Sequence, residues 1–533
     1  MTTSDEAIAG EALSDPYLQN FVNEPYLDFS SPRHRRRMQE ALARVREQLG
    51  ATYPLVIGDE QLPDGNLMAS TNPARPDEVI GRVPVADAEL TERAIRQAEE
   101  AFESWRVAPA QERAAVLFRA ADLIRERIFE LSAWMILEVG KNWAEAYGDA
   151  AEAVDFCNFY GSQALRLAAP QPLTPHASEE LELRYIPLGV GAIIPPWNFP
   201  FAIPAGLVAA AVVTGNTVVF KPASDAPVIG YKLFEILRQA GLPAGVCNFL
   251  PGSGSVVGRA LVSHTRVRFV VFTGSREVGL EIAEQAGRSQ SGQIWIKRTI
   301  LEMGGKNATI VDRDADLDAA AQGVAAAAFG YQGQKCSACS RAIVDEAVYE
   351  EFLDKLIAAS QEIRVGPPDE YDNWMGPMIN SSALDKALQY IQIGKQEGRL
   401  VLGGSALKGD GFFLQPTIFA DVSPQARLAQ DEIFAPVLAV IKARDFDHAL
   451  GIANGTDYGL TGAVYCRDPG KLEQAKQEFH VGNLYLNRKC TGALVGCHPF
   501  GGFNMSGTDS KTGGRDYLLL FTQAKSIARN VSA

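Results

Sequence analysis

A cysteine stands where a predicted helix gives way to a predicted strand. Cys336 follows an Ala-rich helical pattern over residues 317–329 and a short Gly/Gln-rich segment, and a β-type run over residues 341–345 comes after it. A thiol presented at such a junction is a candidate nucleophile. A free cysteine is also among the residues most often buried as a small hydrophobe, so the neighbours of Cys336 must decide between the two interpretations.

Two polar side chains in apolar surroundings could act with this thiol. Asn198 lies in the Pro-locked turn 196–200, where its amide could cap a turn or donate to a developing oxyanion. Glu302 ends a predicted strand just before the pair Gly304 and Gly305. A half-buried carboxyl group with a raised pKa is a suitable general base, although a solvated turn acid would show the same pattern.

Glycine-rich junctions between strands and helices indicate a dinucleotide site. Residues 252–258 resemble the G-x-G-x-x-G pattern with one extra residue, which is a weak signal alone. A second junction carries Gly274 and Ser275, where backbone N–H groups at a helix start could accept a pyrophosphate. Lys221 ends another apolar strand and could bond a ribose or phosphate, or simply be a surface lysine.

Strands and helices alternate through most of the chain. The candidate side chains described above lie at the ends of these elements. Near-continuous apolar strands alternate with helices over residues 189–286, which predicts an α/β fold with a doubly wound parallel sheet. A second alternation begins near residue 299. We therefore expect an N-terminal helical arm (1–50), a dinucleotide-binding domain (51–165 and 189–300), a catalytic domain (301–486), and a small β extension for oligomerisation with an anchor loop (166–188 and 487–533).

Composition excludes several classes of protein. The 533 residues carry a net charge of −14, which disfavours nucleic acid and anionic membranes as partners. Residues 185–220 lack charge, but five prolines interrupt them, so no membrane span is expected. Seven cysteines without regular spacing predict a reducing, cytoplasmic location and no metal site, and no signal peptide precedes them. The basic run 33–37 begins an amphipathic helix and predicts a solvent-exposed face of that helix.

The combined motifs resemble those of the aldehyde dehydrogenase superfamily over about residues 53–525. The matching segments are 196–200, 221–222, 272–275, 301–305, 333–336, 432–434 and 499–502. Within the superfamily the chain is most similar to the members that oxidise L-glutamate γ-semialdehyde, formed from 1-pyrroline-5-carboxylate, in proline breakdown. Residues 21–25, 329–337, 479–485 and 487–496 carry that finer resemblance.

The resemblance implies a cysteine-based oxidation that uses NAD. Cys336 attacks the aldehyde, Asn198 and the Cys336 backbone N–H stabilise the oxyanion, and Glu302 activates water to release the acid. For the cofactor it implies contacts from Lys221, Ser224, Gly274, Ser275, Gly304, Glu432 and Phe434. It also implies a homo-oligomer built on a dimer, and a proline dehydrogenase as an associated enzyme. Residues 518–531 are β-like but have no core-sized partner of their own, so we expect them to pair with another subunit's sheet.

The same resemblance implies a substrate site beside the thiol. Gly492 and Ala493 belong to a loop that grips the substrate's α-carboxylate, and Ser337 adds a hydroxyl donor. Phe199 and Phe500 sandwich the aliphatic chain, and Glu152 lies near the ammonium group. From the residues alone, Glu152 could equally be a surface acid of its helix and Phe500 ordinary core.

Three departures from the family pattern qualify these expectations. Ala493 stands where some relatives carry Ser, so one carboxylate contact is absent, and Ala435 replaces a usual Gly, which is tolerated unless its φ is positive. Ser224 stands where NAD-preferring members often have Glu, so we expect NADP to be tolerated. The alternatives left open are a dehydrogenase for another semialdehyde such as succinate semialdehyde, an esterase side activity, and a non-catalytic relative.

Overall fold

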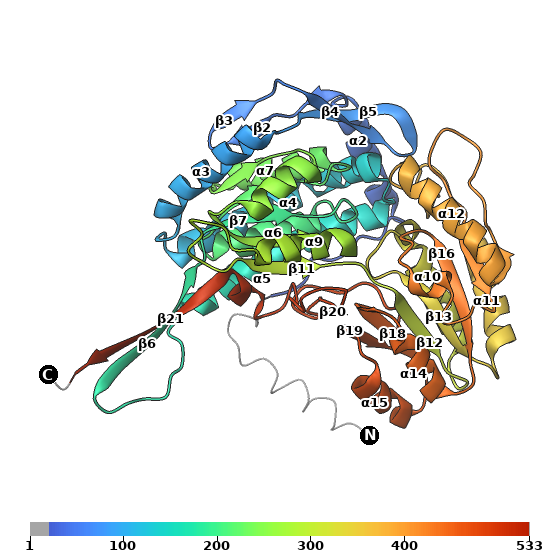
Figure 1. Cartoon of the computed structure of the whole chain (residues 1–533). Coiled ribbons are helices and arrows are strands. Elements are labelled where there is room, and N and C mark those ends of the chain that lie inside the picture. The colour runs from blue at the N-terminus through green and yellow to red at the C-terminus, as the bar shows by residue number, and fades with distance from the viewer. Residues whose placement is uncertain (1–20, 532–533) are drawn as a thin grey trace.

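Two seven-stranded sheets lie side by side and form the body of the molecule (Figure 1). The computed structural model describes residues 21–531. In the first sheet the strand order is β11 (Arg298–Glu302), β10 (Val267–Thr273), β7 (Val190–Ile194), β8 (Thr217–Phe220), β9 (Cys247–Phe249), β2 (Leu55–Ile57) and β3 (Glu60–Leu62). The five strands from β11 to β9 run parallel, whereas β2 and β3 extend the sheet in antiparallel fashion.

Buried apolar strands explain why helices cover both faces of this sheet. Every residue of β7 and β8 is buried, so neither face can meet water. One face packs on α3 (Ala88–Trp105) and α8 (Arg259–Ser263), and the other on α4 (Ala110–Val139), α6 (Ala202–Val213) and α7 (Pro227–Gln239). The predicted α/β fold with a doubly wound parallel sheet is thereby confirmed.

The second sheet repeats the same principle. Its strand order is β14 (Arg399–Leu402), β15 (Thr417–Ala420), β16 (Val437–Ala443), β13 (Cys339–Asp345), β12 (Asn307–Val311), β18 (Thr461–Tyr465) and β19 (Asn483–Leu486), and all pairs except β14–β15 are parallel. The helices here are α10 (Leu317–Phe329), α11 (Tyr349–Gln361), α12 (Ser381–Glu397), α13 (Arg427–Gln430), α14 (Phe446–Asn454) and α15 (Pro469–Glu478).

The segments outside the two sheets frame the body. A three-stranded sheet joins β1 (Ala51–Thr52), β5 (Arg75–Pro84) and β4 (Leu67–Asn72), and a short pair joins β17 (Tyr458–Gly459) to β20 (Phe503–Asn504). Helix α5 (Trp143–Ala168) packs along α4, with Asn142 capping its first turn. Helix α2 (Pro32–Arg46) also packs on α4 and is shorter than the sequence predicts.

A two-stranded ribbon projects from the body, at the lower left in Figure 1. It pairs β6 (Glu179–Pro187) with β21 (Thr522–Asn530) in antiparallel register over nine residues, and the short helix η3 (Tyr517–Phe521) leads into it. We expected the tail to pair with another subunit's sheet. One edge of β21 instead finds its partner within the chain, and the other edge carries no strand in the described structure.

Two local features differ from the simplest expectation. The glycine-rich segment Gly254–Gly258 forms a single π-turn, η1, ahead of α8, because the extra residue in the motif adds length without ending the helix. Within residues 21–531, no helix combines the length and apolar character needed to cross a membrane. The Pro-interrupted run 185–220 forms β7, α6 and β8 instead.

Candidate active site

Three consecutive left-handed residues shape the loop that presents Cys336. After α10 ends, Tyr331, Gln332 and Gly333 have φ values of 50°, 57° and 65°. Such a run is unfavourable for side-chain-bearing residues and persists only where the surroundings enforce it. At Gly333 a Cβ would lie 2.4 Å from the Ala435 carbonyl oxygen, so only glycine fits. The turn delivers Cys336, half-buried, ahead of β13.

Asn307 holds this loop from the neighbouring strand. Its Nδ2 donates to the carbonyl oxygens of Cys336 at 2.7 Å and Ala338 at 2.8 Å, and its Oδ1 accepts from the Thr461 N–H at 2.9 Å. Asn307 is the first residue of β12 and was not among the residues we predicted from the sequence. Its position directly after the Glu302–Lys306 motif was the available signal.

Asn198, predicted as a partner of the thiol, lies against the same loop. It follows β7 in a turn that leads into α6, and its side-chain Nδ2 donates to the Gln334 carbonyl oxygen at 3.0 Å. Gln334 is in turn fixed by its Oε1, which accepts from the Ile379 N–H at 2.9 Å. The buried Asn198 amide is therefore held two residues from Cys336 along the loop.

Glu302 ends β11, where parallel strands point their carboxyl ends toward the site. Its carboxylate accepts hydrogen bonds from the Ser510 hydroxyl and from the Gly502 N–H at 3.3 Å. Burial raises the pKa of Glu302 to about 8, although both hydrogen bonds favour the ionised form. A carboxyl group that titrates near neutral pH suits a general base.

The surroundings of Cys336 favour the protonated thiol. Burial raises the pKa of Cys336 to about 12, and the negative charges of Glu432 and Glu302 act in the same direction. Attack by this thiol therefore requires removal of a proton. Glu302 borders the same cavity, and its pKa is raised to about 8.

A cavity of about 330 Å³ brings the predicted substrate residues together. Cys336 and Glu302 open onto it, and so do all six residues predicted to contact substrate, namely Glu152, Phe199, Ser337, Gly492, Ala493 and Phe500. Gly492 has a φ of 83°, which turns the loop at a point that favours glycine. The lining combines an apolar body with a few polar groups, as small-molecule sites do.

Helix α5 forms one wall of this cavity. Glu145, Asp149 and Glu152 recur at intervals of three or four residues, so they share one helical face, which lines the cavity. Glu152 is half-buried, and burial together with the Asp149 and Asp155 charges raises its pKa to about 8. It therefore borders the cavity and is not an ordinary solvated helix acid.

A buried ion pair that we did not predict braces the same wall. Lys141 Nζ lies 3.2 Å from Asp149 Oδ2, and neither side chain is appreciably exposed. The Lys141 ammonium also sits 4.0 Å from the Phe199 ring centroid and 4.2 Å from that of Tyr331. Asp149 accepts a hydrogen bond from the Ala202 N–H at 2.6 Å. The ion pair therefore contacts the turn around Asn198 at two points, the Phe199 ring and the Ala202 backbone.

The predicted cofactor residues lie along the carboxyl ends of the first sheet. Lys221 is buried, its Nζ donates to its neighbour's carbonyl oxygen at Pro222, and burial lowers its pKa to about 8. A buried ammonium without a bonded carboxylate is a fitting partner for ligand oxygens. Ser275 caps α9 (Arg276–Gly287), and Gly274 passes so near Phe272 that a Cβ would lie 2.4 Å from its ring. Ser224 is exposed in the turn after Lys221.

Glu432 and Gly304 meet closely between the two sheets. A Cβ on Gly304 would lie 2.1 Å from Glu432 Oε2, and Glu432 Oε1 accepts from the Gly305 N–H at 3.0 Å. Burial raises the pKa of Glu432. Phe434 has a φ of 60° and packs edge-on against Trp197, whereas Ala435 is absent from the residues with positive φ. The replacement of the usual glycine by Ala435 is therefore tolerated, as expected.

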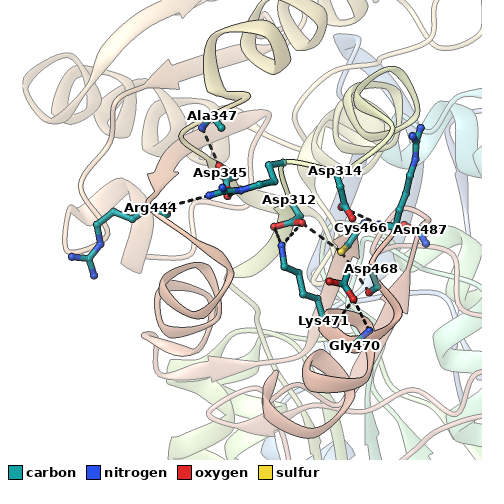
Figure 2. A network of polar contacts seen from close by, with 12 residues as sticks. Asp312, Asp314, Asp345, Ala347, Arg444, Cys466, Asp468, Gly470, Lys471 and Asn487 are labelled. Atoms are coloured by element: carbon teal, nitrogen blue, oxygen red, sulfur yellow. Dashed lines mark hydrogen bonds and ion pairs between the residues drawn. The ribbon is translucent and has the colours of Figure 1, made fainter.

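A cluster of potential metal ligands lies apart from the cavity (Figure 2). Asp312, Asp314 and Cys466 place oxygen and sulfur atoms within 4.8 Å of one another. The Lys471 ammonium, however, donates to both Asp312 oxygens, at 2.7 and 3.0 Å. An amino group thus supplies the positive charge that these carboxylates face, so the cluster is an ion-pair network at the end of the second sheet.

The fold and this site define an aldehyde dehydrogenase. The model of the aldehyde dehydrogenase family matches residues 61–527, and the chain belongs to that family. It is 55% identical over 511 residues to a 1-pyrroline-5-carboxylate dehydrogenase of Geobacillus thermodenitrificans, covering 96% of this chain and 99% of that protein. A Geobacillus kaustophilus protein of the same name is also 55% identical over 511 residues, with the same coverage.

A solved structure agrees closely with this fold. A crystal structure of 1-pyrroline-5-carboxylate dehydrogenase from Thermus with bound NAD superposes with a TM-score of 0.94 at 51% identity, covering 96% of this chain and 99% of that one. A proline utilization A protein from Bdellovibrio bacteriovorus superposes with a TM-score of 0.95 at 45% identity; the match covers 97% of this chain and 54% of that longer one.

Proposed function

We propose that the chain oxidises L-glutamate γ-semialdehyde, the open form of 1-pyrroline-5-carboxylate, to L-glutamate with NAD, as a step of proline breakdown. The observation that carries the proposal is the single cavity onto which Cys336, Glu302 and the loop of Gly492 and Ala493 all open. The names of relatives that match 96% of the chain support the same substrate. An aldehyde that also carries an amino-acid group needs both a nucleophile for its carbonyl carbon and a binding site for its α-carboxylate.

The side chains divide the chemistry into two stages. Glu302 takes the Cys336 proton, directly or through water, and releases it to solvent before the second stage. The Cys336 thiolate adds to the aldehyde carbon, while the Asn198 amide and the Cys336 backbone N–H donate to the oxyanion. Loss of a hydride from that carbon leaves a thioester on Cys336. Glu302 then takes a proton from water, the resulting hydroxide attacks the thioester, and L-glutamate leaves as the Cys336 sulfur is released.

Bound NAD would supply the hydride acceptor, and several residues fit its binding. Lys221 offers a buried ammonium to the adenosine ribose, and Gly274 and Ser275 offer a helix start to the pyrophosphate. Val256 and Val278 are 43% and 44% exposed on the first turns that follow the two glycine-rich junctions, which leaves apolar surface for the adenine. Glu432 and Phe434 would hold the nicotinamide ribose, with Gly304 allowing close approach. Exposed Ser224 would leave room for a 2′-phosphate.

The cavity lining also supports selectivity for one aldehyde substrate over others. Gly492, Ala493 and Ser337 would bind the α-carboxylate, Phe199 and Phe500 would hold the aliphatic chain, and Glu152 would face the ammonium. A site with buried polar groups discriminates strongly against an analogue that leaves those groups unpaired. Substrates without the amino-acid end should therefore react poorly.

A steady-state comparison tests this assignment. We expect kcat/KM for L-glutamate γ-semialdehyde to exceed the values for succinate semialdehyde and propanal by at least about 100-fold, since each unmade polar contact costs about 1–3 kcal/mol. NADH formation at 340 nm is the readout. Equal kcat/KM for glutamate and succinate semialdehydes would refute the proposed substrate and leave only the general activity.

We further propose a homo-oligomer based on a dimer, assembled through the projecting ribbon. Within residues 21–531 the outer edge of β21 carries no second strand, and such an edge can pair with a strand of another subunit. A proline dehydrogenase is proposed as the enzyme that supplies substrate, and the longer proline utilization A chain supports such an association. The free cysteines of the described chain support a reducing cytoplasm. Light scattering would test the assembly.

A further inference from the structure

An extended N-terminal arm, residues 21–29, is tied to the two walls of the substrate cavity. Asn23 Nδ2 donates to Asp155 Oδ2 at 2.9 Å, and the Glu24 N–H donates to Asp155 Oδ1 at 2.7 Å, which fixes the arm to α5. The Asn23 amide also donates to the Val495 carbonyl oxygen at 3.0 Å. Since Val495 closely follows Gly492 and Ala493, the arm joins the α5 wall to the loop proposed to grip carboxylate.

Further contacts make this tether specific. Arg125 Nε donates to Glu24 Oε2 at 2.8 Å, and the Phe21 ring packs edge-on against Phe159 of α5 at 5.2 Å between centroids. Phe21 also lies against Gly496, where a Cβ would come within 3.1 Å of its ring. Polar and aromatic contacts thus fix the arm on both sides of the cavity mouth.

Tyr26 is the arm residue that reaches the cavity. It belongs to the lining, and its ring lies against α5 at Gly148, where a Cβ would be 3.5 Å from the ring edge. Gly148 precedes Glu152 by one helical turn, so ring and carboxyl border the same end of the cavity. Partial desolvation and the negative charges of Glu152, Asp155 and Asp149 raise the pKa of Tyr26, which therefore stays neutral.

The arm lies outside the part of the chain that the family shares. The family match begins at residue 61, whereas the 1-pyrroline-5-carboxylate dehydrogenases match over 96% of the chain. A cavity wall built from such a segment can serve the particular substrate and is not needed for the common chemistry. The chemistry itself resides in Cys336, Asn198 and Glu302, all within the shared part.

We propose that the ring of Tyr26 completes the subsite in which Glu152 faces the substrate's α-ammonium group, so that the N-terminal arm sets the preference for an amino-acid aldehyde. This inference rests on the proposed function. The ammonium is bonded to the same carbon as the carboxylate, and the arm is tied directly to the carboxylate loop. An aromatic face and a carboxyl group are two partners that a cation favours. The Lys141 ammonium on the same wall is already paired with Asp149, so it opposes the substrate cation less than a free charge would.

The test compares two aldehydes that differ only in the ammonium group. L-glutamate γ-semialdehyde and glutarate semialdehyde share the carbon chain and carboxylate. Tyr26 is 60% exposed, so we expect Tyr26→Ala to raise KM for the first about fivefold, the loss of one cation–π contact at an exposed site, with kcat unchanged. KM for glutarate semialdehyde should stay within about twofold of wild type, because no cation is bound there. Calorimetric titration with L-glutamate and with glutarate should show the same contrast without turnover.

Matched variants separate a subsite from a disturbed fold. Tyr26→Phe keeps the ring and should retain the wild-type preference. Val22→Ala alters a side chain on the same arm that is 81% exposed, and it should change neither substrate's KM. Equal losses on both aldehydes, no loss with the glutamate compound, or a Tyr26→Phe variant that behaves like Tyr26→Ala would each overturn the inference. A wild type that lacks the preference would instead refute the proposed function.

Discussion

Ser510 should tune the pH at which Glu302 becomes a base. The Ser510 hydroxyl donates to Glu302 Oε1, and Ser510 itself is 4% exposed, so water cannot readily replace it. That hydrogen bond stabilises only the ionised carboxylate. Ser510→Ala removes it, and the pKa of Glu302, already raised to about 8 by burial, should rise further.

The size of the effect follows from the strength of one buried hydrogen bond to a charge. Such a bond contributes about 1.5–3 kcal/mol, and about 1.4 kcal/mol corresponds to one pKa unit, so the shift should be about 1–2 units. At pH 7.5 a carboxyl group with a pKa near 8 is roughly one-quarter ionised, and a shift of one unit leaves about 3%. Hydrolysis of the thioester should therefore slow about eightfold at that pH.

The assay is thioester hydrolysis as a function of pH. In both proteins the rate should rise with pH, because only the deprotonated carboxyl group acts as base, and the Ser510→Ala curve should lie at higher pH and approach wild type near pH 10. A burst of NADH followed by a slow steady rate would isolate this step. Ser360→Ala is a matched control, since Ser360 is equally buried and donates to the Leu356 carbonyl oxygen in α11, away from the cavity.

Two results would refute this reasoning. A Ser510→Ala rate lowered by one constant factor from pH 6.5 to 9.5 would show a geometric defect with no change in the pKa of Glu302. An unchanged profile would show that Glu302 is not the base in hydrolysis. Glu302→Gln provides the reference, since it cannot accept the proton and should give a burst with almost no subsequent turnover at any pH.

The remaining predictions concern the thiol and the cofactor. Cys336→Ala should give no detectable oxidation while binding NAD with unchanged affinity by calorimetry; turnover in this variant would remove the central role of the thiol. Ser224→Glu should lower kcat/KM with NADP roughly tenfold through repulsion of the 2′-phosphate at this exposed site and leave NAD within about twofold. An absence of NADP turnover in the wild type would contradict the expectation about Ser224 at the outset.

Much of the fold and the site was predictable because it rests on local patterns. The apolar run of β7 and the glycine pair after Glu302 are visible in the sequence as local composition. The structure has a buried strand at β7 and places Glu302 at the end of β11, as expected. The substrate residues of the cavity, such as Glu152 and Gly492, followed instead from the resemblance to the aldehyde dehydrogenase superfamily. The division of the chain into four parts remains a prediction.

What the sequence could not reveal depends on contacts between distant segments. Tyr26 and Glu152 are separated by more than a hundred residues, and no periodicity joins an extended arm to a helix face. Lys141 looks like an ordinary helix-end lysine until its pairing with Asp149 is seen. The left-handed backbone at Tyr331 and Gln332 carries no glycine signal, because tertiary contacts enforce it.

The left-handed turn before Cys336 also bears on how ligands enter. The Tyr331 hydroxyl donates to the Val139 carbonyl oxygen at 3.0 Å, and Gln332 Nε2 donates to the carbonyl oxygens of Gly140 and Pro377 at 3.2 and 2.8 Å. The turn is thus hydrogen-bonded to the C-terminal end of helix α4, which packs on the first sheet, and to the loop before α12. Hinge opening between the two halves would have to break these buried bonds. If these bonds stay intact, the crevice is assembled before reactants enter, and little binding free energy is lost to ordering it.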